Sequence, residues 1–162
     1  MKKMLCCAFA VMIILSACGR ESESAFEQYV IKVDSLADED LSTVFSEKQV
    51  MDELIVGQSA STITDDRWQK GISNDSYHAS NVTLGGHTAT ITITQEDGTI
   101  KDTDYVFAPG DEGEAKDIID SIIVALGEPD VERDGDDVLS LYWDDPTFML
   151  MFFKSTNHIT VS

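Results

Sequence analysis

The chain is short of basic residues, free cysteine and long apolar segments, and each shortage excludes a class of function. Its 162 residues include 11 lysines and arginines against 30 acidic residues, for a formal net charge of −19. A surface of that sign repels phosphate, which argues against binding DNA, RNA or an anionic bilayer. No internal segment approaches the about 18 apolar residues that a membrane-spanning helix needs. Apolar residues still make up 43% of the chain, which is enough for a packed core.

All three cysteines lie near the N-terminus, at Cys6, Cys7 and Cys18. The lysines at 2–3 precede an apolar run at 4–15, which has the length of a secretory signal and is too short to span a membrane. This run ends in Leu-Ser-Ala-Cys at 15–18, which resembles the lipobox of bacterial lipoproteins. The resemblance implies cleavage after residue 17 and attachment of diacylglycerol and palmitate-type acyl chains to Cys18.

This processing predicts a signal peptide at 1–17, a lipidated cysteine with a polar tether at 18–25, and a single α+β domain at 26–162. Each buried CH₂ group of an acyl chain contributes about 0.8 kcal/mol, so the anchor would hold the protein at a membrane. Gly19 stands where an aspartate favours inner-membrane retention in Gram-negative lipoproteins. The expected location is therefore the extracytoplasmic side of the cell membrane or of the outer membrane.

Loss of the leader would leave the folded part without a free thiol. Disulfide bonds, cysteine-ligated metals and a cysteine nucleophile are then excluded. The spaced histidines His78, His87 and His158 do not form a zinc-binding pattern, and no GxSxG, HExxH or phosphate-binding glycine loop occurs. We therefore expect a protein that is not an enzyme.

Two helices are expected in the first part of the domain. Apolar residues at helical spacing from Phe26 to Leu36 predict the first. Ser46 and Gln49 form a capping-box pattern that predicts the start of the second, with Gly57 at its C-terminal end. Residues 58–80 are polar and predict a loop or a short irregular strand.

The segment 87–107 alternates isoleucine or alanine with threonine and predicts a β-hairpin. A two-residue turn at 97–98 would place Ile91 opposite Asp104, so we prefer a three-residue loop at 97–99. The preferred register pairs Ile93 with Thr103, Ile91 with Tyr105 and Ala89 with Phe107.

The last part predicts a helix and a three-stranded meander. The apolar stripe and acidic first turn of 112–126 predict the helix, which Gly127 and Pro129 end. Strands follow at 138–143, at 147–154, where the apolar run should be central and covered by the helix on one side, and around Ile159 and Val161. The fold class is α+β, with two or three helices packed on a small antiparallel sheet.

This last part, 111–162, resembles the SmpA/OmlA/BamE-like lipoproteins and the β-lactamase-inhibitor-protein-like domains. The resemblance rests on Gly127 and Pro129 after the helix and on the order of the strands that follow. It implies a protein-binding module of the cell envelope with no catalytic residues to transfer. The hairpin before the helix is an addition to that pattern. A degenerate tandem repeat, with 46–57 plus 87–107 as one copy and 113–162 as the other, would account for it.

Two groups of residues are candidates for binding. The acidic loop 130–137 begins like an EF-hand, with Gly135 at position 6 but Leu141 at position 12, where a glutamate is needed. It predicts either a weak Ca²⁺ site or a solvated connection between strands. Its candidate ligands are Asp130, Glu132, Asp134 and Asp136.

Aromatic residues beside polar segments are the second group, because aromatics often anchor protein interfaces, and plain packing in the core is the alternative for each. These candidates are Trp68, Tyr77, Tyr142 and Trp143. The expected function is a lipid-anchored, extracytoplasmic protein-binding module, with the membrane bound through Cys18, another envelope or secreted protein as partner, and no nucleic acid. Weak binding of Ca²⁺ or a small ligand, and inhibition of a secreted enzyme, are the alternatives.

Overall fold

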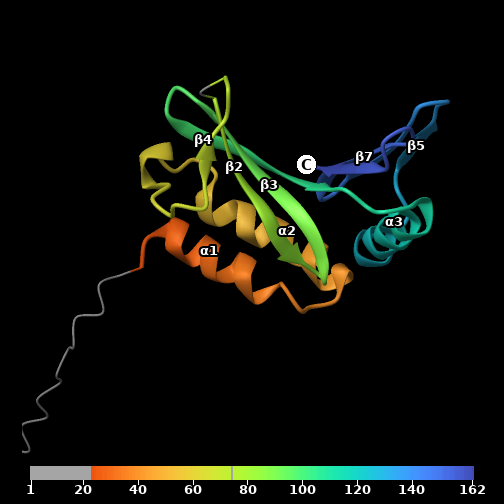
Figure 1. Cartoon of the computed structure of the whole chain (residues 1–162), viewed down its shortest axis with the longest axis horizontal. Helices are drawn as coiled ribbons and strands as arrows, with labels where there is room; N and C mark the ends of the chain where they lie inside the picture. The colour runs from red at the N-terminus through yellow and green to blue at the C-terminus, as the bar shows by residue number, and fades with distance from the viewer. Residues whose placement is uncertain (1–22, 74) are drawn as a thin grey trace, which may run out of the picture.

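The computed structural model describes residues 23–73 and 75–162, which form an α+β fold around one antiparallel sheet (Figure 1). Eight strands make up this sheet, in the order β1-β2-β3-β4-β8-β7-β6-β5. The predicted fold class is therefore confirmed. The signal sequence, the lipobox and Cys18 lie outside the described residues. Among the helices that the structure describes, none is long and apolar enough to cross a membrane.

The elements follow one another in two similar series. The helices and one 3₁₀ turn are α1 (Ala25–Ser35), α2 (Leu41–Ile55), η1 (Ala60–Thr62) and α3 (Glu112–Leu126). The strands are β1 (Gln69–Lys70), β2 (Ser76–Leu84), β3 (His87–Glu96), β4 (Thr99–Phe107), β5 (Val131–Asp134), β6 (Val138–Asp144), β7 (Thr147–Phe153) and β8 (His158–Val161).

The sheet has an N-terminal half, β1–β4, and a C-terminal half, β5–β8. Each half is an antiparallel meander that follows a helix, and the last strands of the two meanders pair with each other, Tyr105 opposite Val161. The second meander therefore runs outward in the opposite direction from the first. The repeated topology fits the arrangement of a tandem, with β1 and β2 as parts of the first series that the sequence analysis did not include. A common ancestry of the two series stays a prediction.

All three helices contribute to one core on a single face of the sheet, which we call the covered face. Phe45 of α2 contacts both Phe107 of β4 and Phe148 of β7, so this helix spans the junction between the halves. The α3 helix packs beside α2 and supplies Ile118 and Ile122 to the core. Figure 1 shows the helices gathered along the sheet. The opposite side is called the open face.

The α3 helix has the predicted bounds, and α1 begins one residue earlier than expected, with a capping box between Ser24 and Glu27. The predicted start of α2 at Ser46 is wrong. The helix begins at Leu41, because the Asp40 carboxylate accepts a hydrogen bond from the backbone N–H of Ser42 at 2.7 Å and caps it. Hydrogen bonds from the side chain and the backbone N–H of Ser42 lower the pKa of Asp40. Ser46 lies inside the helix, where its hydroxyl donates to the carbonyl of Ser42.

The β3–β4 hairpin has the predicted register, but a different turn produces it. Ile91 pairs with Tyr105 and Ala89 with Phe107, as expected. Asp97 and Gly98 alone form the turn, with φ of 51° and 76°, the positive values that a type I′ turn requires. A bulge at Lys101 then shifts the pairing by one residue and keeps the acidic side chains away from the isoleucines.

Two strands lie in segments without a firm strand prediction, since 58–80 is predicted as a loop or a short irregular strand and 130–137 as an acidic loop. The β2 strand falls partly within 58–80, and its alternation is interrupted by a bulge at which Asn81 has φ of 59°. The β5 strand falls within the acidic loop 130–137 and pairs with β6, from Val131 opposite Tyr142 to Asp134 opposite Leu139. Partner strands specify both elements more strongly than their own residues do.

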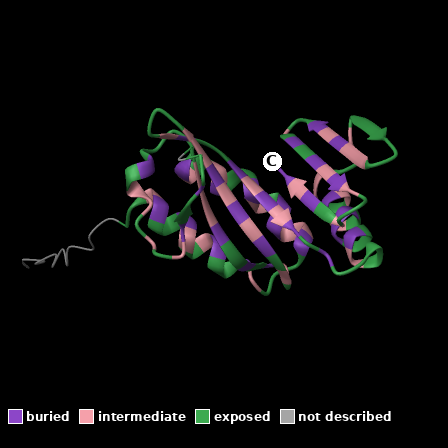
Figure 2. Ribbon diagram, turned by 45° about the horizontal axis from the view of Figure 1, so that its top comes forward, coloured by how far each residue is buried: buried purple, intermediate pink, exposed green. Residues whose placement is uncertain are grey.

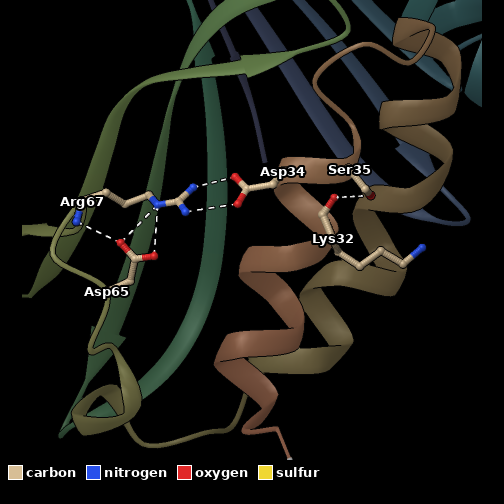
Figure 3. A network of polar contacts seen from close by, with 5 residues as sticks. All are labelled: Lys32, Asp34, Ser35, Asp65 and Arg67. Atoms are coloured by element: carbon tan, nitrogen blue, oxygen red, sulfur yellow. Dashed lines mark hydrogen bonds and ion pairs between the residues drawn. The ribbon is translucent and has the colours of Figure 1, made fainter.

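The loop after η1 is fastened to α1 by Arg67 (Figure 3). Its two terminal nitrogens donate to the two carboxylate oxygens of Asp34 at 2.6 and 3.2 Å, and its Nε donates to Asp65. The next residue, Trp68, packs against Phe26 and Tyr29 of the same helix. The ion pairs therefore hold a buried indole in place at the N-terminal end of the covered face.

Candidate interaction surface

The open face of the C-terminal half carries apolar side chains that no described helix covers. Successive residues of each strand point to opposite faces of the sheet. Leu141 and Leu150 face the helices, while the neighbouring pair Tyr142 and Met149 faces the open side. Val131 of β5 lies opposite Tyr142 on that same side. We call this set the apolar patch: Val131, Val138, Tyr142, Met149, Met151 and Phe153.

The centre of the apolar patch is hollowed. A depression of about 440 Å³ is lined by Val131, Arg133, Ser140, Leu141, Tyr142 and Met149. Val131 is 42% exposed and Met149 is 39% exposed; within the described chain they are the exposed large apolar side chains that lie on strands. Figure 2 shows the exposed and half-buried bands on these strands. Contiguous apolar surface of this kind is typical of a binding site.

Acidic residues are frequent in the segment that forms one side of this hollow, although Glu132 and Asp134 alternate with Val131 and Arg133 on β5 and therefore face the helix side. The segment 128–145, which forms β5, β6 and their connections, carries eight carboxylates: Glu128, Asp130, Glu132, Asp134, Asp136, Asp137, Asp144 and Asp145. We call them the acidic rim. Asp134 is paired with Lys154 at 2.5 Å, and Asp130 accepts a hydrogen bond from the backbone N–H of Asp144 at 2.9 Å. Most of the rim thus keeps its negative charge available to a partner.

Arg133 is the one basic residue within the acidic rim segment, and it lies on the wall of the hollow. Across residues 23–73 and 75–162, every other lysine or arginine forms an ion pair or lies over an aromatic ring. The Arg133 guanidinium makes neither contact in this part of the chain. Its charge is therefore available to a ligand that binds the apolar patch.

The open face of the N-terminal half is polar. Its β3 side chains are the threonines at 88, 90, 92 and 94, and Asp102 and Asp104 of β4 face the same way, opposite Thr94 and Thr92. Partial burial raises the pKa of Asp104, and the neighbouring charge of Asp102 raises it further. This half offers hydrogen-bonding groups and charge, without an apolar hollow among the residues described on it.

Of the four predicted interface aromatics, only Tyr142 lies on the open face. Trp68 and Trp143 are in the core, where Trp143 donates its indole N–H to the carbonyl of Gly127 at 2.8 Å, so both are corrected. The reason is register, since Trp143 sits one residue from Tyr142 on a strand. Tyr77 is half-buried against the core on β2, between β1 and β3, with Lys70 of β1 over its ring.

The proposed calcium ligands are spread along a hairpin. Glu132 and Asp134 lie at alternate positions of β5, about 7 Å apart, and Asp130 immediately precedes this extended strand, so the three do not form a coordinating loop. In the part of the chain that the structure describes, no group of three or more histidine, cysteine, aspartate or glutamate residues is placed to hold a metal ion. His87 instead contacts Glu114 at 2.8 Å.

A buried charged cluster on the covered face was not anticipated. The Lys48 ammonium, 1% exposed, donates to Asp52 at 2.7 Å and to the carbonyl and hydroxyl oxygens of Thr103 at 2.9 and 3.2 Å. Burial raises the pKa of Asp52, which Lys48 partly opposes. The i,i+4 spacing of the lysine and aspartate signals a pair, but it does not signal burial. All three ammonium donors are used inside the protein, which makes the cluster structural.

Fold and surface together define an α+β protein with helices on one face of its sheet and an acid-rimmed apolar patch on the other. No protein-family model, curated protein or solved structure matches the chain. The case for its function therefore rests on its own residues.

Proposed function

We propose that this protein is a lipid-anchored, extracytoplasmic binding module of the bacterial cell envelope, and that it binds another protein without catalysing a reaction. The observation that carries the proposal is the apolar patch. Its side chains lie on strands and on the side of the sheet away from the described helices, with Val131 and Met149 substantially exposed. Burying apolar side chains against a partner releases about 25 cal/mol for each Å² removed from water.

The N-terminal sequence supports the cellular part of the proposal. Lysines at 2–3, a short apolar run and Leu-Ser-Ala-Cys at 15–18 resemble a lipoprotein signal. Lipid attached to Cys18 would place the domain outside the cytoplasm and beside a membrane. The strong negative charge of the chain makes attachment through lipid, rather than through surface charge, the consistent arrangement.

The resemblance of 111–162 to SmpA/OmlA/BamE-like lipoproteins supports the same class, since these are small envelope modules. The absence of catalytic sequence motifs favours binding over catalysis. Inhibition of a secreted enzyme would be one form of such binding, and the same surface would serve it.

Site-specific photo-crosslinking of the full chain in its native membranes tests the binding proposal. A photoreactive amino acid replaces Tyr142 at the apolar patch in one variant and Thr92 on the polar open face in the other. We expect a discrete adduct from position 142 and not from 92. Equal adduct patterns from both positions, or none from 142, would contradict the proposal.

The anchor has its own test. Metabolic labelling with palmitate should mark the native protein, and the Cys18→Ala variant should lose the label and leave the membrane fraction. Retention of the label in that variant would show that another residue is acylated.

A further inference from the structure

The apolar patch and its acidic rim specify more about a partner than that it is a protein. From this geometry we propose that the patch binds a cationic amphipathic segment of another polypeptide, one with apolar residues at its centre and lysine or arginine toward its ends. The inference rests on the proposed function, because it names the chemistry of the partner at that same surface.

The apolar centre follows from the hollow. Its depression of about 440 Å³ is lined by Val131, Tyr142 and Met149 among others. Met151 and Phe153 extend the apolar surface along β7, half-buried beside the hollow. Most of the lining is apolar, with Arg133 and Ser140 as exceptions, so a polar side chain over the apolar part would lose hydration and apolar side chains fit the centre best.

The positive ends follow from the acidic rim. Eight carboxylates lie within 128–145, and Asp136, Asp137 and Asp145, in the connections at the ends of the strands, form no ion pair with any described residue. Their combined field attracts cations and accelerates encounter with them. An anionic segment would be repelled at the same distance. Charge complementarity therefore selects a basic partner.

The same charges oppose two other occupants. A second copy of this chain would bring its own acidic rim against the first, so self-association through this face carries like-charge repulsion. An anionic lipid surface would be repelled in the same way.

Arg133 adds a positional constraint. Because it lies on the wall of the hollow without an ion pair in the described chain, its guanidinium disfavours a cation directly over the centre. A partner whose basic residues flank an apolar centre avoids that repulsion and still meets the rim. An apolar segment bearing a carboxylate would instead use Arg133 as its ligand, which makes this residue the discriminating position.

Binding of synthetic peptides to the full chain in phosphatidylcholine nanodiscs tests the inference. The fluorescent probe is a peptide with a leucine-rich centre and lysines at both ends. A second peptide carries glutamates in place of the lysines, and a third carries serines in place of the leucines. Anisotropy titrations compare the native chain with its variants in matched nanodiscs, so peptide binding to lipid is common to all samples.

Met149→Ser should weaken binding of the lysine–leucine peptide about fivefold or more, as truncation of an interface anchor does. The matched control is Val124→Ser, because Val124 is an exposed apolar side chain on α3, away from the patch. It should leave the affinity unchanged. Arg133→Ser should tighten binding about threefold, and salt should weaken it. The glutamate and serine peptides should bind at least tenfold more weakly.

Three results would overturn the inference. Equal effects of Met149→Ser and Val124→Ser would remove the patch from the interaction. Stronger binding of the glutamate peptide, with weaker binding in Arg133→Ser, would assign the hollow to a carboxylate-bearing segment. Failure of every peptide beside a discrete crosslink from position 142 would reject the cationic chemistry while leaving the proposed binding function standing. An unfolding midpoint equal to that of the native chain shows that Met149→Ser is folded.

Discussion

The two halves of the sheet differ on both of their faces. In the N-terminal half, threonines and two aspartates line the open face, and the Lys48–Asp52–Thr103 cluster lies on the covered face. In the C-terminal half, the open face carries the apolar patch, and Leu141, Leu150 and the buried α3 isoleucines meet on the covered face. The halves therefore differ in what their open faces expose and in the buried charged cluster, which lies beneath the N-terminal half.

This difference separates stability from binding. An exposed apolar residue on a sheet contributes little to the free energy of folding, because water still reaches it. One that faces the helices is buried and contributes the full free energy of its removal from water. The C-terminal half alternates these two kinds along a single strand. Its covered residues should therefore control folding and its open residues should control association.

Leu150→Ala gives the largest expected effect on this comparison. Leu150 is fully buried beneath the helices, so its truncation should lower the free energy of unfolding by about 3 to 4 kcal/mol. Met149→Ala, one residue away and on the open face, should cost less than about 1 kcal/mol. Urea denaturation of the two variants measures the difference. Similar losses of stability in both variants would mean that Met149 is packed as tightly as Leu150, which would contradict its exposure in the structure.

Lys48→Ala tests the polar half next. Removal of the ammonium leaves the Asp52 carboxylate and the Thr103 oxygens without their buried donor, at a cost of about 3 kcal/mol. The Lys48→Met, Asp52→Leu double variant removes both charges and should recover much of that loss, since apolar pairs can replace buried ion pairs. Chemical denaturation of both variants provides the measurement. A double variant no more stable than Lys48→Ala would show that the ion pair itself is required.

The contrast between the halves also explains what the sequence could predict. The α3 helix and the β3–β4 register follow from strong periodicity, because most apolar residues there point to one side. The pairing remained correct although its turn was not, since a two-residue turn with a bulge and a three-residue loop lead to the same register in the body of the hairpin. The hydrophobic pattern therefore decided the pairing, and the turn adapted to it.

Tertiary context decided the rest. Strand β5 consists of Val-Glu-Arg-Asp, all exposed, and only pairing with β6 makes it a strand. The apolar patch was likewise not predicted, because the run 147–154 is apolar on both of its sides and the helices cover one of them. Sequence can predict that a strand is apolar on two sides. It does not predict which side is left open.

Arg67→Ala should have a smaller effect, confined to the N-terminal half. Arg67 joins Asp34 of α1 to Asp65 of the loop that carries Trp68, and the pairs are partly exposed. Their loss should lower the free energy of unfolding by about 1 kcal/mol, and less in high salt. Lys116→Ala, which breaks an exposed pair within α3, is the control and should cost less than about 0.5 kcal/mol. Thermal unfolding at two salt concentrations compares them. Equal losses of stability in the two variants, independent of salt, would show that the Arg67 ion pairs do not stabilise this half.

The smallest expected effect is a pH dependence carried by Asp104 on the polar open face. Partial burial raises the pKa of its carboxyl in the folded chain, so the unfolded chain releases this proton first as pH rises. Ionisation therefore favours unfolding above the ordinary aspartate pKa of about 3.9, and the cost is complete once pH exceeds the raised folded value. Asp104→Asn removes that cost and should stabilise the protein by a few tenths of a kcal/mol at pH 7, by roughly the size of a cross-strand contact.

The gain should shrink as pH falls through about 4 and vanish below about 3, where the carboxyl is protonated in both states. Asp137→Asn removes one charge from an exposed position in the acidic rim and controls for the general relief of negative charge. Thermal midpoints of both variants at pH 7, 4.5 and 3 separate the two effects. If Asp104→Asn gains no more than Asp137→Asn at pH 7, the polar face carries no buried acid. The N-terminal half would then resemble the C-terminal half in the solvation of its open face, although the two would still differ in polarity.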